Sequence, residues 1–586
     1  MSEEHSDTAE SNGGVSDAAR PDEGAADGAR PDDAADAARS DGAGGDETRP
    51  GEAATCDARP DGGRPGQEPS EDGSVASFVE YGIEDRPPLG ESILLGVQHY
   101  LTMVGANVAV PLILAGTLGM PANLWPRFIG TFFVVSGLAT LAQTTFGNRY
   151  PIVQGAPFSM LAPALAVIGV VQATNPTGMA DWRAALLSLQ GAIIVAALFE
   201  VAVGYLGLIG RIRRYLSPVV IAPTIALIGL SLFSTGQVTS ATQNWPLLLL
   251  TLVLITLFSQ YLDTRVRAFK LFPVLLGVVT AYAVAAVLSA LGVYAAGTAG
   301  YVDMGTIFEA PAVVVPTPLQ WGVPRVEASL VVGMLAGVGA SIVESFGDYH
   351  AVARLSGLGA PSERRINHGI GMEGLMNVFA GVMGAGGSTS YSENIGAIGL
   401  TGVASRYVVQ IGAVAMLGVG FVGYFGAFIR SIPDPVIGGL YVAMFGQIVA
   451  VGLSNLKYVD LDSSRNIYVI GVALFVGLAI PAYMANVASA APEGVGGAAF
   501  FRQNMRNVAV LGPVLGTKVV ADTVYVIGGT GMAVGGLVAF LLDNTIPGTR
   551  KERGLEAWDA ISEDDTDFES AFDRFGSDDS RAVRSD

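Results

Sequence analysis

The stretch Ser388–Gly402 reads S-T-S-Y-S-E-N-I-G-A-I-G-L-T-G. It places a carboxylate, Glu393, and an amide, Asn394, among glycines in a segment that is otherwise apolar. Upstream lies S-I-V-E-S-F-G-D-Y, in which Glu344 and Asp348 stand one helical turn apart. A carboxylate at membrane depth costs about 3 kcal/mol or more, so it usually marks a transport pathway or a binding site. The two stretches together predict a membrane transporter whose site lies where they meet.

The composition of the chain indicates a membrane protein. Its 586 residues have a mean hydropathy of +0.46, and 50% are hydrophobic while 15% are charged. A soluble domain carries about a quarter charged residues. The charges crowd toward the two ends of the chain and leave a nearly uncharged middle. We therefore expect several passes through the lipid bilayer of the cytoplasmic membrane, flanked by two polar tails.

The two tails are acidic. The net charge is −20 and the sequence pI is about 4.6, so nucleic-acid binding, which needs a basic face, is disfavoured. The N-terminal tail is rich in Gly, Ala, Asp and Pro and has almost no aromatic or β-branched residues. Such a segment cannot bury enough apolar surface to offset the entropy of ordering, so we expect it to be disordered. Dense carboxylates of this kind also fit a high-salt cytoplasm.

Apolar segments follow one another through the middle of the chain. A straight helical span needs about 20 apolar residues, and the sequence has fourteen apolar segments that we interpret as spans, in two groups of seven. Because seven is odd, the second group enters the membrane from the opposite side, as an inverted repeat requires. We thus predict an all-α polytopic membrane protein. The expected spans are 92–115, 127–146, 153–172, 185–208, 216–235, 246–262, 271–294, 327–348, 370–386, 392–402, 405–429, 435–455, 465–485 and 520–543.

The same pattern divides the chain into domains, and its basic residues orient them. The expected divisions are a disordered tail (1–80), a first seven-span repeat (81–295), an extracellular linker loop (296–326), a second repeat (327–545) and an acidic cytoplasmic tail (546–586). Loops on one side of this topology hold most of the Arg and Lys residues, including the run at 211–214. By the positive-inside rule that side is cytoplasmic, as are both termini.

Two segments are poor membrane helices, and each stands third in its group. Pro151–Pro163 reads P-I-V-Q-G-A-P-F-S-M-L-A-P, a strand-like run followed by an apolar half. Gly384–Gly402 likewise has small polar residues before an apolar half-helix. Interrupted segments at matching positions of two halves indicate a transporter's binding site, because irregular backbone is tolerated where it lines a cavity. We therefore expect the site between segments three and ten.

Five motifs carry a resemblance to a known family. E-N-I-G-A-I-G-L-T-G, at 393–402, fits a signature in which Q, E or P precedes N-x-G, four residues, T, and then R, K or G. Four further matches follow the family order: V-Q-H-Y-L-T-M-V-G-A-N-V-A-V-P at 97–111, Q-W-G-x-P at 320–324, E-S-F-G-D-Y-H-A-V-A-R-L-S-G at 344–357 and N-H-G-I-G-M-E-G at 367–374. The chain therefore resembles the nucleobase–ascorbate transporters, also called nucleobase–cation symporter-2 proteins.

The resemblance implies a fold and a function. Its fold is fourteen helices in two inverted repeats, with a core domain of helices 1–4 and 8–11 and a gate domain of helices 5–7 and 12–14. Its function is the transport of uracil, xanthine, uric acid or a related base, driven by a proton or sodium gradient, without cofactor, metal or enzymatic activity. Members often act as dimers, which implies a homodimer through the gate-domain helices.

The expected substrate is a planar base with N–H donors and C=O acceptors along its edge. Glu344 and Glu393, when ionised, offer acceptors to ring N–H groups, and backbone N–H groups at the half-helix starts offer donors to exocyclic oxygens. Phe158 and Tyr391 are the candidates for stacking on the ring. The remaining expected substrate-binding residues are Ser159 and Asn394.

Coupling to an ion gradient is expected at buried acids. Burial disfavours the charged form of a carboxylate, so such a group can exchange protons near neutral pH. We expect the protonation of Glu344 to be linked to substrate occupancy. Asp348 is expected to tune Glu344 or to bind the proton or sodium ion, and Glu373 to organise the core. His99 is the last of the predicted coupling residues.

Each assignment has a plainer alternative. Glu344 could belong to a structural ion pair, Asn394 could cap the half-helix, and Tyr391 could pack against its neighbours. His99 lies in an apolar segment and fits a hydrogen-bonded core residue better than a ligand. Glu200, near the end of the fourth segment, is interpreted as structural.

The sequence leaves the substrate open. Glu393 is frequent in uracil-type members of the family, whereas Asp348 resembles the purine-type pattern and Gly402 removes a charge that often ends the motif. Ascorbate is disfavoured because its carriers have Pro where Glu393 stands. Two other classes remain as alternatives. One is an anion carrier or channel of the related sulfate-type architecture, against which two acids argue. The other is an intramembrane hydrolase, whose G-x-G-D and H-E-x-x-H motifs are absent from the sequence.

Overall fold

A computed structural model describes residues 79–174, 178–209, 215–556, 568 and 570. All of them belong to one compact unit of the chain, Ser74–Asp586. The predicted N-terminal tail up to residue 78, much of the predicted C-terminal tail and the basic run 211–214 lie outside the described residues.

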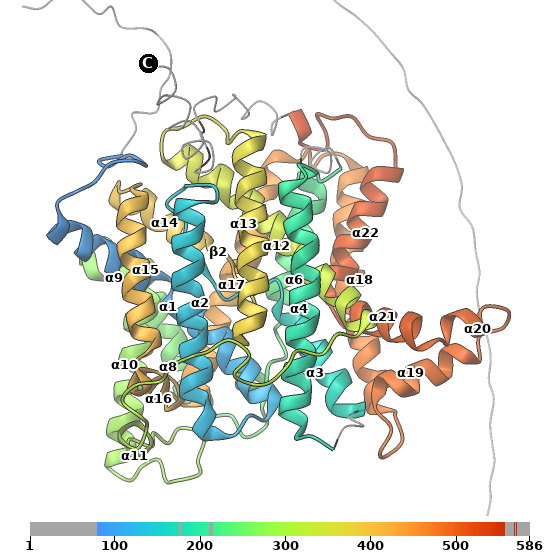
Figure 1. The fold of residues 1–586 in the computed structure, drawn as a ribbon, viewed down its shortest axis with the longest axis horizontal. Helices are drawn as coiled ribbons and strands as arrows, with labels where there is room; N and C mark the ends of the chain where they lie inside the picture. The colour runs from blue at the N-terminus through green and yellow to red at the C-terminus, as the bar shows by residue number, and fades with distance from the viewer. Residues whose placement is uncertain (1–78, 175–177, 210–214, 557–567, 569, 571–586) are drawn as a thin grey trace, which may run out of the picture. The chain divides into compact units, whose positions relative to one another are not determined.

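The described residues are mostly helical (Figure 1). The first half contains α1 (Leu89–Leu118), η1 (Ala122–Leu124), α2 (Trp125–Thr145), β1 (Gln154–Gly155), α3 (Leu161–Thr174), α4 (Asp181–Tyr205), α6 (Pro218–Leu230), α7 (Gly236–Thr239), α8 (Trp245–Thr256), η2 (Leu257–Tyr261), α9 (Arg267–Leu271), α10 (Pro273–Ala290) and α11 (Gly305–Phe308). The second half contains α12 (Ala328–Leu355), α13 (Glu363–Met383), β2 (Thr389–Ser390), α14 (Ser392–Thr401), α15 (Arg406–Gly420), α16 (Gly423–Arg430), α17 (Asp434–Ser454), η3 (Asn455–Tyr458), α18 (Ser464–Ser489), α19 (Gly497–Arg506), α20 (Gly512–Leu515), α21 (Lys518–Gly528) and α22 (Gly531–Thr545).

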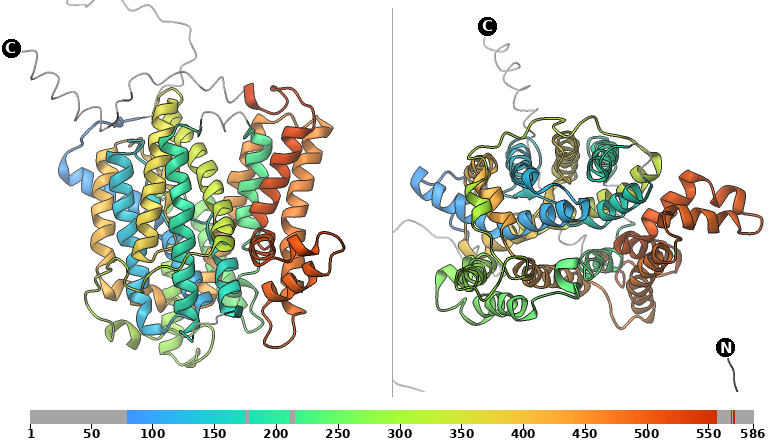
Figure 2. Two further views of the ribbon diagram at one scale, coloured as in Figure 1. Left: turned by 45° about the vertical axis from the view of Figure 1, so that its right-hand side comes forward. Right: turned by 90° about the horizontal axis from the view of Figure 1, so that it is seen from below.

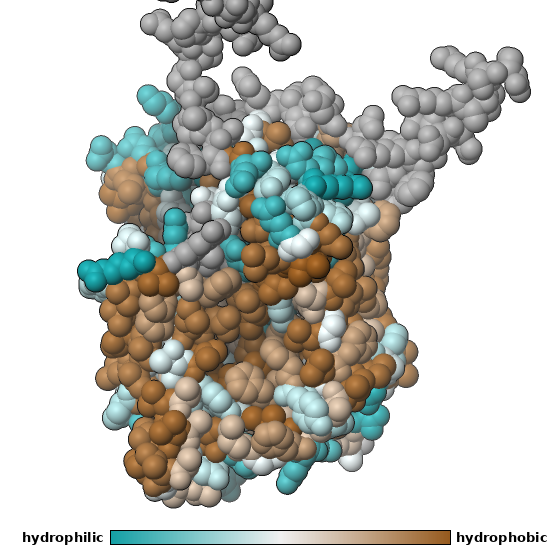
Figure 3. All heavy atoms as spheres, turned by 90° about the vertical axis from the view of Figure 1, so that its left-hand side faces the viewer, coloured by the Kyte–Doolittle hydropathy of each residue, from teal (hydrophilic) through white to brown (hydrophobic). Residues whose placement is uncertain are grey.

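Several of these helices can cross a membrane. Within the described residues, six are long and apolar enough, and the number rises to eight if each of two bent pairs is one span. The six are Ala122–Thr145, Asp181–Tyr205, Pro273–Ala290, Ala328–Leu355, Asp434–Tyr458 and Ser464–Ser489. Figure 3 shows a broad hydrophobic band on one face, with hydrophilic residues gathered above and below it. These are the features of a multi-pass membrane protein.

Each predicted span coincides with at least one helix, but two of the spans are split. Segment 405–429 is divided between α15 and α16, and segment 520–543 between α21 and α22, whose axes differ by 94°. The sequences at the breaks are G-F-V-G (420–423) and G-G-T-G (528–531). Glycine favours helix ends because it loses more conformational entropy in a helix than other residues do. A single continuous helix over 520–543 is therefore wrong.

The two interrupted segments are confirmed, and they meet. β1 and β2 pair antiparallel, with Gln154 opposite Ser390 and Gly155 opposite Thr389. Each strand is followed by a helix, α3 after β1 and α14 after β2. Strand pairing thus brings the starts of two helices from distant parts of the chain together.

The helices α15, α2, α13 and α4 stand side by side next to these segments (Figure 1). α4 and α13 run antiparallel at close range, with Gly204 against Gly371 at one end and Ile194 against Gly381 further along. A Cβ on Gly204 would lie 2.2 Å from the backbone nitrogen of Gly371, so only glycine fits there. Small residues at such crossings let membrane helices touch backbone to backbone. α2 and α15 form a similar pair.

A second group of helices, α6, α8, α10, α17, α18 and α22, forms another row, seen from below in Figure 2. In this row α17 packs along α6 and α8, α10 packs along α8, and α18 and α22 pack along each other and α6. The site described next lies against α6 and α17 of this row.

The first described residues are fastened to the end of α14. Tyr81 forms a bridge with Val403, and Glu84 pairs with Arg149 at 2.7 Å and with Arg406 at 2.5 Å. The chain therefore enters the bundle at the end where α2 and α14 finish and α15 begins.

Candidate functional site

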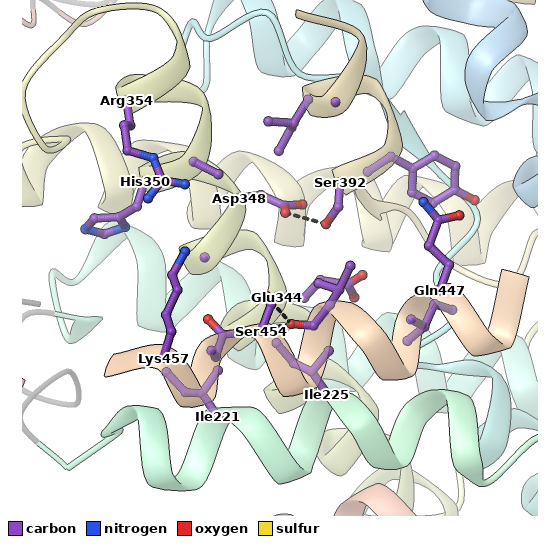
Figure 4. Close-up of a pocket in the computed structure, with 18 of the residues that line it drawn as sticks. Ile221, Ile225, Glu344, Asp348, His350, Arg354, Ser392, Gln447, Ser454 and Lys457 are labelled. Atoms are coloured by element: carbon purple, nitrogen blue, oxygen red, sulfur yellow. Dashed lines mark hydrogen bonds between the residues drawn. The ribbon is translucent and has the colours of Figure 1, made fainter. Parts of the chain in front are cut away.

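A cavity of about 290 Å³ lies between α12 and α14 on one side and α6 and α17 on the other (Figure 4). Its wall comes from α12, the start of α14 and Phe158 on one side and from the second row, through α6 and α17, on the other. The lining residues are Phe158, Ile221, Ile225, Glu344, Gly347, Asp348, His350, Ala351, Arg354, Tyr391, Ser392, Ile395, Gly396, Gln447, Ile448, Val451, Ser454, Asn455, Lys457 and Tyr458. The sequence-predicted residues among them are Phe158, Glu344, Asp348 and Tyr391.

Helix α12 presents two acids to the cavity. Glu344 and Asp348 are four residues apart, which puts them on one face of the helix about 6 Å apart along its axis. Asp348 is buried and Glu344 is half-buried. Gly347 also lines the cavity, and its lack of a side chain leaves room beside both carboxylates.

Two serines from the interrupted segment hold Asp348. Ser392, the first residue of α14, donates to Oδ1 at 2.6 Å, and Ser390 of β2 donates to Oδ2 at 2.8 Å. The predicted meeting of the Glu344–Asp348 stretch with the interrupted segment is thereby confirmed. Both carboxylate oxygens are occupied, so Asp348 also fixes the start of α14 against α12.

The two aromatic candidates lie in the wall of the cavity. The Tyr391 hydroxyl donates to the backbone oxygen of Ala156 at 2.6 Å, which ties the second interrupted segment to the first. Phe158 meets Phe445 of α17 edge to face, with ring centroids 5.8 Å apart. Phe158 therefore touches the opposite row of helices, and Tyr391 has a packing role in addition to its place in the wall.

Asn394 lies outside the cavity lining and joins the two interrupted segments. It is fully buried, its Oδ1 accepts from the backbone nitrogen of Val153 at 3.0 Å, and its Nδ2 donates to the backbone oxygen of Pro151 at 3.1 Å. It makes no capping hydrogen bond at the start of α14, where the cap position is Tyr391. The capping alternative is therefore wrong.

His99 and Ser159 are buried beside these segments and are not among the residues that line the cavity. His99 of α1 lies with its Nδ1 3.5 Å from Nδ2 of Asn394, which fits the core alternative given for it above. The hydroxyl of Ser159 has no hydrogen-bond partner among the described residues. The side chain of Glu393 lies outside what the structure describes.

Glu373 of α13 is a buried carboxylate surrounded by hydroxyl groups. Ser341 and Thr389 lie 2.8 and 3.0 Å from its Oε1, and Ser345 and Tyr349 lie 2.6 and 3.3 Å from its Oε2. These groups come from α12 and β2, so Glu373 holds α13, α12 and the second interrupted segment together. The coupling role expected for Glu373 stays a prediction.

A chain of hydroxyls connects Glu373 with the cavity. Ser345 lies 2.6 Å from Glu373 and 2.8 Å from Ser390, and Ser390 donates to Asp348. Hydroxyls can both donate and accept, so this chain can pass a proton between the two acids. Among the described residues, no group of three or more His, Cys, Asp or Glu side chains is placed to hold a metal ion.

The sequence relationships agree with this geometry. A model of the permease family matches residues 90–486. The chain belongs to this family. Solute carrier family 23 member 2 of Rattus norvegicus is 41% identical over 522 residues, which cover 82% of this chain and 77% of the relative. Nucleobase-ascorbate transporter 2 of Arabidopsis thaliana is 33% identical over 502 residues, which cover 82% and 91%. The predicted family resemblance is confirmed, and the protein belongs among multi-pass membrane transporters.

Two solved structures show a weak likeness to this chain. The transmembrane domain of the cyanobacterium bicarbonate transporter BicA is 16% identical, with 67% of this chain and 96% of that one covered and a TM-score of 0.44. The murine anion transporter Slc26a9 in the inward-facing state is 15% identical, with 67% and 65% covered and a TM-score of 0.49.

The sequence did not predict the part of the cavity wall that α6 and α17 supply. Ile221 and Ile225 of α6 and Gln447 and Ser454 of α17 face Glu344 across the cavity (Figure 4). The isoleucines carry no signal, because they are typical of any membrane helix. Gln447 stands alone as an amide in the apolar run V-A-M-F-G-Q-I-V-A-V, which marks it as a candidate.

Proposed function

We propose that this permease is a secondary active transporter of a nucleobase of the uracil/xanthine class, coupled to a proton or sodium gradient across the cytoplasmic membrane. The observation that carries the proposal is the pair of acids, Glu344 and Asp348, in a cavity between α12 and α14 on one side and α6 and α17 on the other. A cavity between two groups of helices suits alternating access, in which one group rocks against the other around a fixed site.

The chemistry of the cavity suits a planar base. Glu344 can accept hydrogen bonds from the ring N–H groups of the base, and Phe158 and Tyr391 can stack their aromatic rings on the faces of the base. The amide of Gln447 both donates and accepts, which matches the mixed edge of a nucleobase. A site built to hydrogen-bond such an edge strongly rejects analogues that lack it. The volume, about 290 Å³, is near the lower end for small-molecule sites.

An anionic substrate is the second candidate. Arg354 and Lys457 line one end of the same cavity, and a cationic pair attracts anions such as ascorbate or sulfate. The carboxylates of Glu344 and Asp348 stand nearer the start of α14 and would repel an anion there. We therefore favour the neutral base, with the anion carrier as the alternative that the same assay tests.

For the architecture we propose two inverted repeats of seven segments, 81–295 and 327–545, joined by the loop 296–326. The helix pairing supports it, because α2 packs along α15 as α4 packs along α13, and α8 along α10 as α18 along α22. In such a repeat, α2 and α4 of the first half correspond to α13 and α15 of the second, and α8 and α10 correspond to α18 and α22. Each packed pair therefore has a packed counterpart. The core domain would then hold α1–α4 and α12–α16, and the gate domain α6–α10 and α17–α22, with both termini cytoplasmic. A homodimer through the gate-domain helices stays a prediction.

For coupling we propose that the cavity acids and Glu373 act together. A proton or sodium ion at Glu344 or Asp348 would neutralise the site when substrate binds, and the hydroxyls of Ser390 and Ser345 would link this change to Glu373. His99, beside Asn394, would support the joint between the interrupted segments.

Transport by purified protein in proteoliposomes tests the proposal. Labelled uracil, xanthine, ascorbate and sulfate are offered under an imposed proton or sodium gradient, with wild type and Glu344→Gln. We expect one base to accumulate under one gradient and the variant to lose this accumulation. Uptake of ascorbate or sulfate without uptake of either base would favour the anion carrier, and normal uptake by Glu344→Gln would move the site elsewhere.

A further inference from the structure

Glu200 of α4 is a buried acid that the proposed site does not use. Its side chain is 0% exposed, and its Oε2 accepts a hydrogen bond from Nδ2 of Asn377 at 2.9 Å. The other oxygen, Oε1, is buried without a hydrogen-bond partner among the described residues. A buried carboxylate needs hydrogen bonds or a counter-ion to persist as an anion, so this environment favours the protonated acid.

The neighbours of Glu200 offer no positive charge. Helix α13 meets Glu200 at the residue after Glu373, where a Cβ on Gly374 would lie 3.0 Å from the backbone carbon of Glu200, and from α12 the Tyr349 hydroxyl lies 3.3 Å from Oε2 of Glu373. Helix α3, which also packs on α4, carries no ionisable residue along its length. No Lys or Arg in the described part of the chain forms an ion pair with Glu200 or Glu373.

The two acids differ in how well they are solvated. Glu373 has four hydroxyl groups within hydrogen-bonding distance, whereas Glu200 has one amide. Two neighbouring carboxylates in a membrane interior are not both ionised at low cost. A proton shared between them therefore resides on Glu200 while Glu373 carries the charge.

Asn377 connects Glu200 with the strand of the site. While its Nδ2 binds Glu200, its Oδ1 accepts from the backbone nitrogen of Ser388 at 2.6 Å. Ser388 directly precedes β2, whose Ser390 holds Asp348. A change of charge on Glu200 therefore acts, through Asn377, on the backbone of the strand that bonds to Asp348.

We propose that Glu200 is a second proton-binding residue of the core helices, and that it exchanges the coupling proton with Glu373. In this exchange the O–H bond of Glu200 breaks as an O–H bond forms on Glu373, so the negative charge moves from Glu373 to Glu200 and the pair keeps one proton. The hydroxyls of Ser345 and Ser390 connect Glu373 with Asp348. This inference rests on the proposed transport function and on proton rather than sodium coupling.

The experiment separates exchange from accumulation. Full-length wild type and Glu200→Gln are reconstituted, and the base that wild type transports is followed in two assays: exchange of labelled for unlabelled base without a gradient, and accumulation driven by a pH gradient. The control is Glu363→Gln, which alters an exposed carboxylate in the first turn of α13. Release or uptake of protons on substrate addition is measured in weakly buffered detergent solution with a pH-sensitive dye.

We expect Glu200→Gln to exchange substrate like wild type but to lose about tenfold in gradient-driven accumulation, within the usual range for coupling between sites. The proton signal should shrink in the same variant and remain in Glu363→Gln. Accumulation and proton signal at wild-type levels in Glu200→Gln would overturn the inference, as would accumulation driven by sodium alone. Loss of exchange together with accumulation would show a structural role and overturn it too.

If Glu200→Gln does not fold, a second variant tests the inference. Aggregation of Glu200→Gln in size-exclusion chromatography would reveal such a defect. Glu200→Asp is then used, because it keeps a carboxylate on a side chain that is one methylene group shorter. We then expect normal exchange and a shifted pH dependence of accumulation, and an unchanged pH dependence would contradict the inference. A wild type that exchanges no base at all contradicts the proposed function itself, and the inference falls with it.

Discussion

The two interrupted segments are built alike, but only the second is held by acids. In the first segment, the backbone nitrogen of Gln154 donates to the hydroxyl of Thr140 at 2.9 Å, and that of Ala156 donates to Oδ1 of Asn107 at 3.0 Å. In the second, the backbone nitrogen of Ser388 donates to Asn377 at 2.6 Å. Side chains from neighbouring helices thus satisfy the free backbone groups of both segments.

The difference lies in what surrounds the second strand. Its serines and threonine bond to Asp348 and Glu373, whereas the anchors of the first strand, Thr140 and Asn107, are neutral. A neutral anchor holds the backbone at every pH, whereas an acidic one changes with protonation. The named anchors of the first strand therefore keep their charge at every pH, whereas the hydrogen bonds of the second strand depend on the protonation of Asp348 and Glu373.

Charging the neutral segment should have the largest effect. Asn107 is fully buried and its Nδ2 has no hydrogen-bond partner among the described residues. Asn107→Asp puts a carboxylate there without a counter-ion, at a cost of about 3 kcal/mol. We expect a clearly lower Tm in a thermal-shift assay, with Asn504→Asp on the exposed side of α19 as the control. Equal Tm values for wild type and Asn107→Asp would mean that both segments tolerate charge.

Neutralising the acidic segment should come next. In Asp348→Asn one carboxylate oxygen becomes an NH₂ group, so either Ser390 or Ser392 faces a donor instead of an acceptor. Loss of a buried hydrogen bond to a charged group costs about 2 kcal/mol. We expect gradient-driven uptake to fall on the order of tenfold or more. The control, Asp460→Asn, changes an exposed carboxylate between η3 and α18, and equal loss in both variants would contradict the special role of Asp348.

Removal of one of the two hydrogen bonds to Asp348 should have a smaller effect. Ser392→Ala removes the 2.6 Å hydrogen bond to Asp348 and leaves the one from Ser390 in place. The expected cost is about 1 kcal/mol, or about a fivefold weaker apparent affinity in uptake assays. Ser489→Ala, which alters an exposed serine at the end of α18 outside the cavity, is the matched control. An unchanged affinity in Ser392→Ala would mean that this hydrogen bond between α14 and α12 does not contribute to substrate binding.

The smallest effect is expected in the wall of the first segment. Phe158→Leu keeps an apolar side chain but removes the ring that faces the cavity and meets Phe445. Loss of an aromatic contact is worth about 1 kcal/mol or less beyond the buried area, so KM should rise about threefold with little change in coupling. Phe475→Leu, on an exposed face of α18, is the control. A change in the ratio of ions to substrate would show that the first segment also responds to ions.

Much of the fold and part of the site followed from the sequence. Hydrophobic length predicted membrane helices, Gly and Pro predicted both interruptions, and the spacing of Glu344 and Asp348 predicted that both face one way. These features are local, because they depend on residues a few positions apart in the chain. The same local signal failed at 520–543, where apolar composition continued through the glycines of a sharp bend.

What the sequence by itself determined is therefore the membrane class, the family, the two interrupted segments and the acids of α12. The tertiary structure alone decided that Asn394 joins Pro151 and Val153 outside the cavity lining, and that Gln447 completes the far wall. It also decided that Glu373 and Glu200 differ in their hydrogen bonds. The physical reason is that these contacts join helices far apart in the chain, and close packing between the helices, rather than any local preference, fixes which polar groups meet.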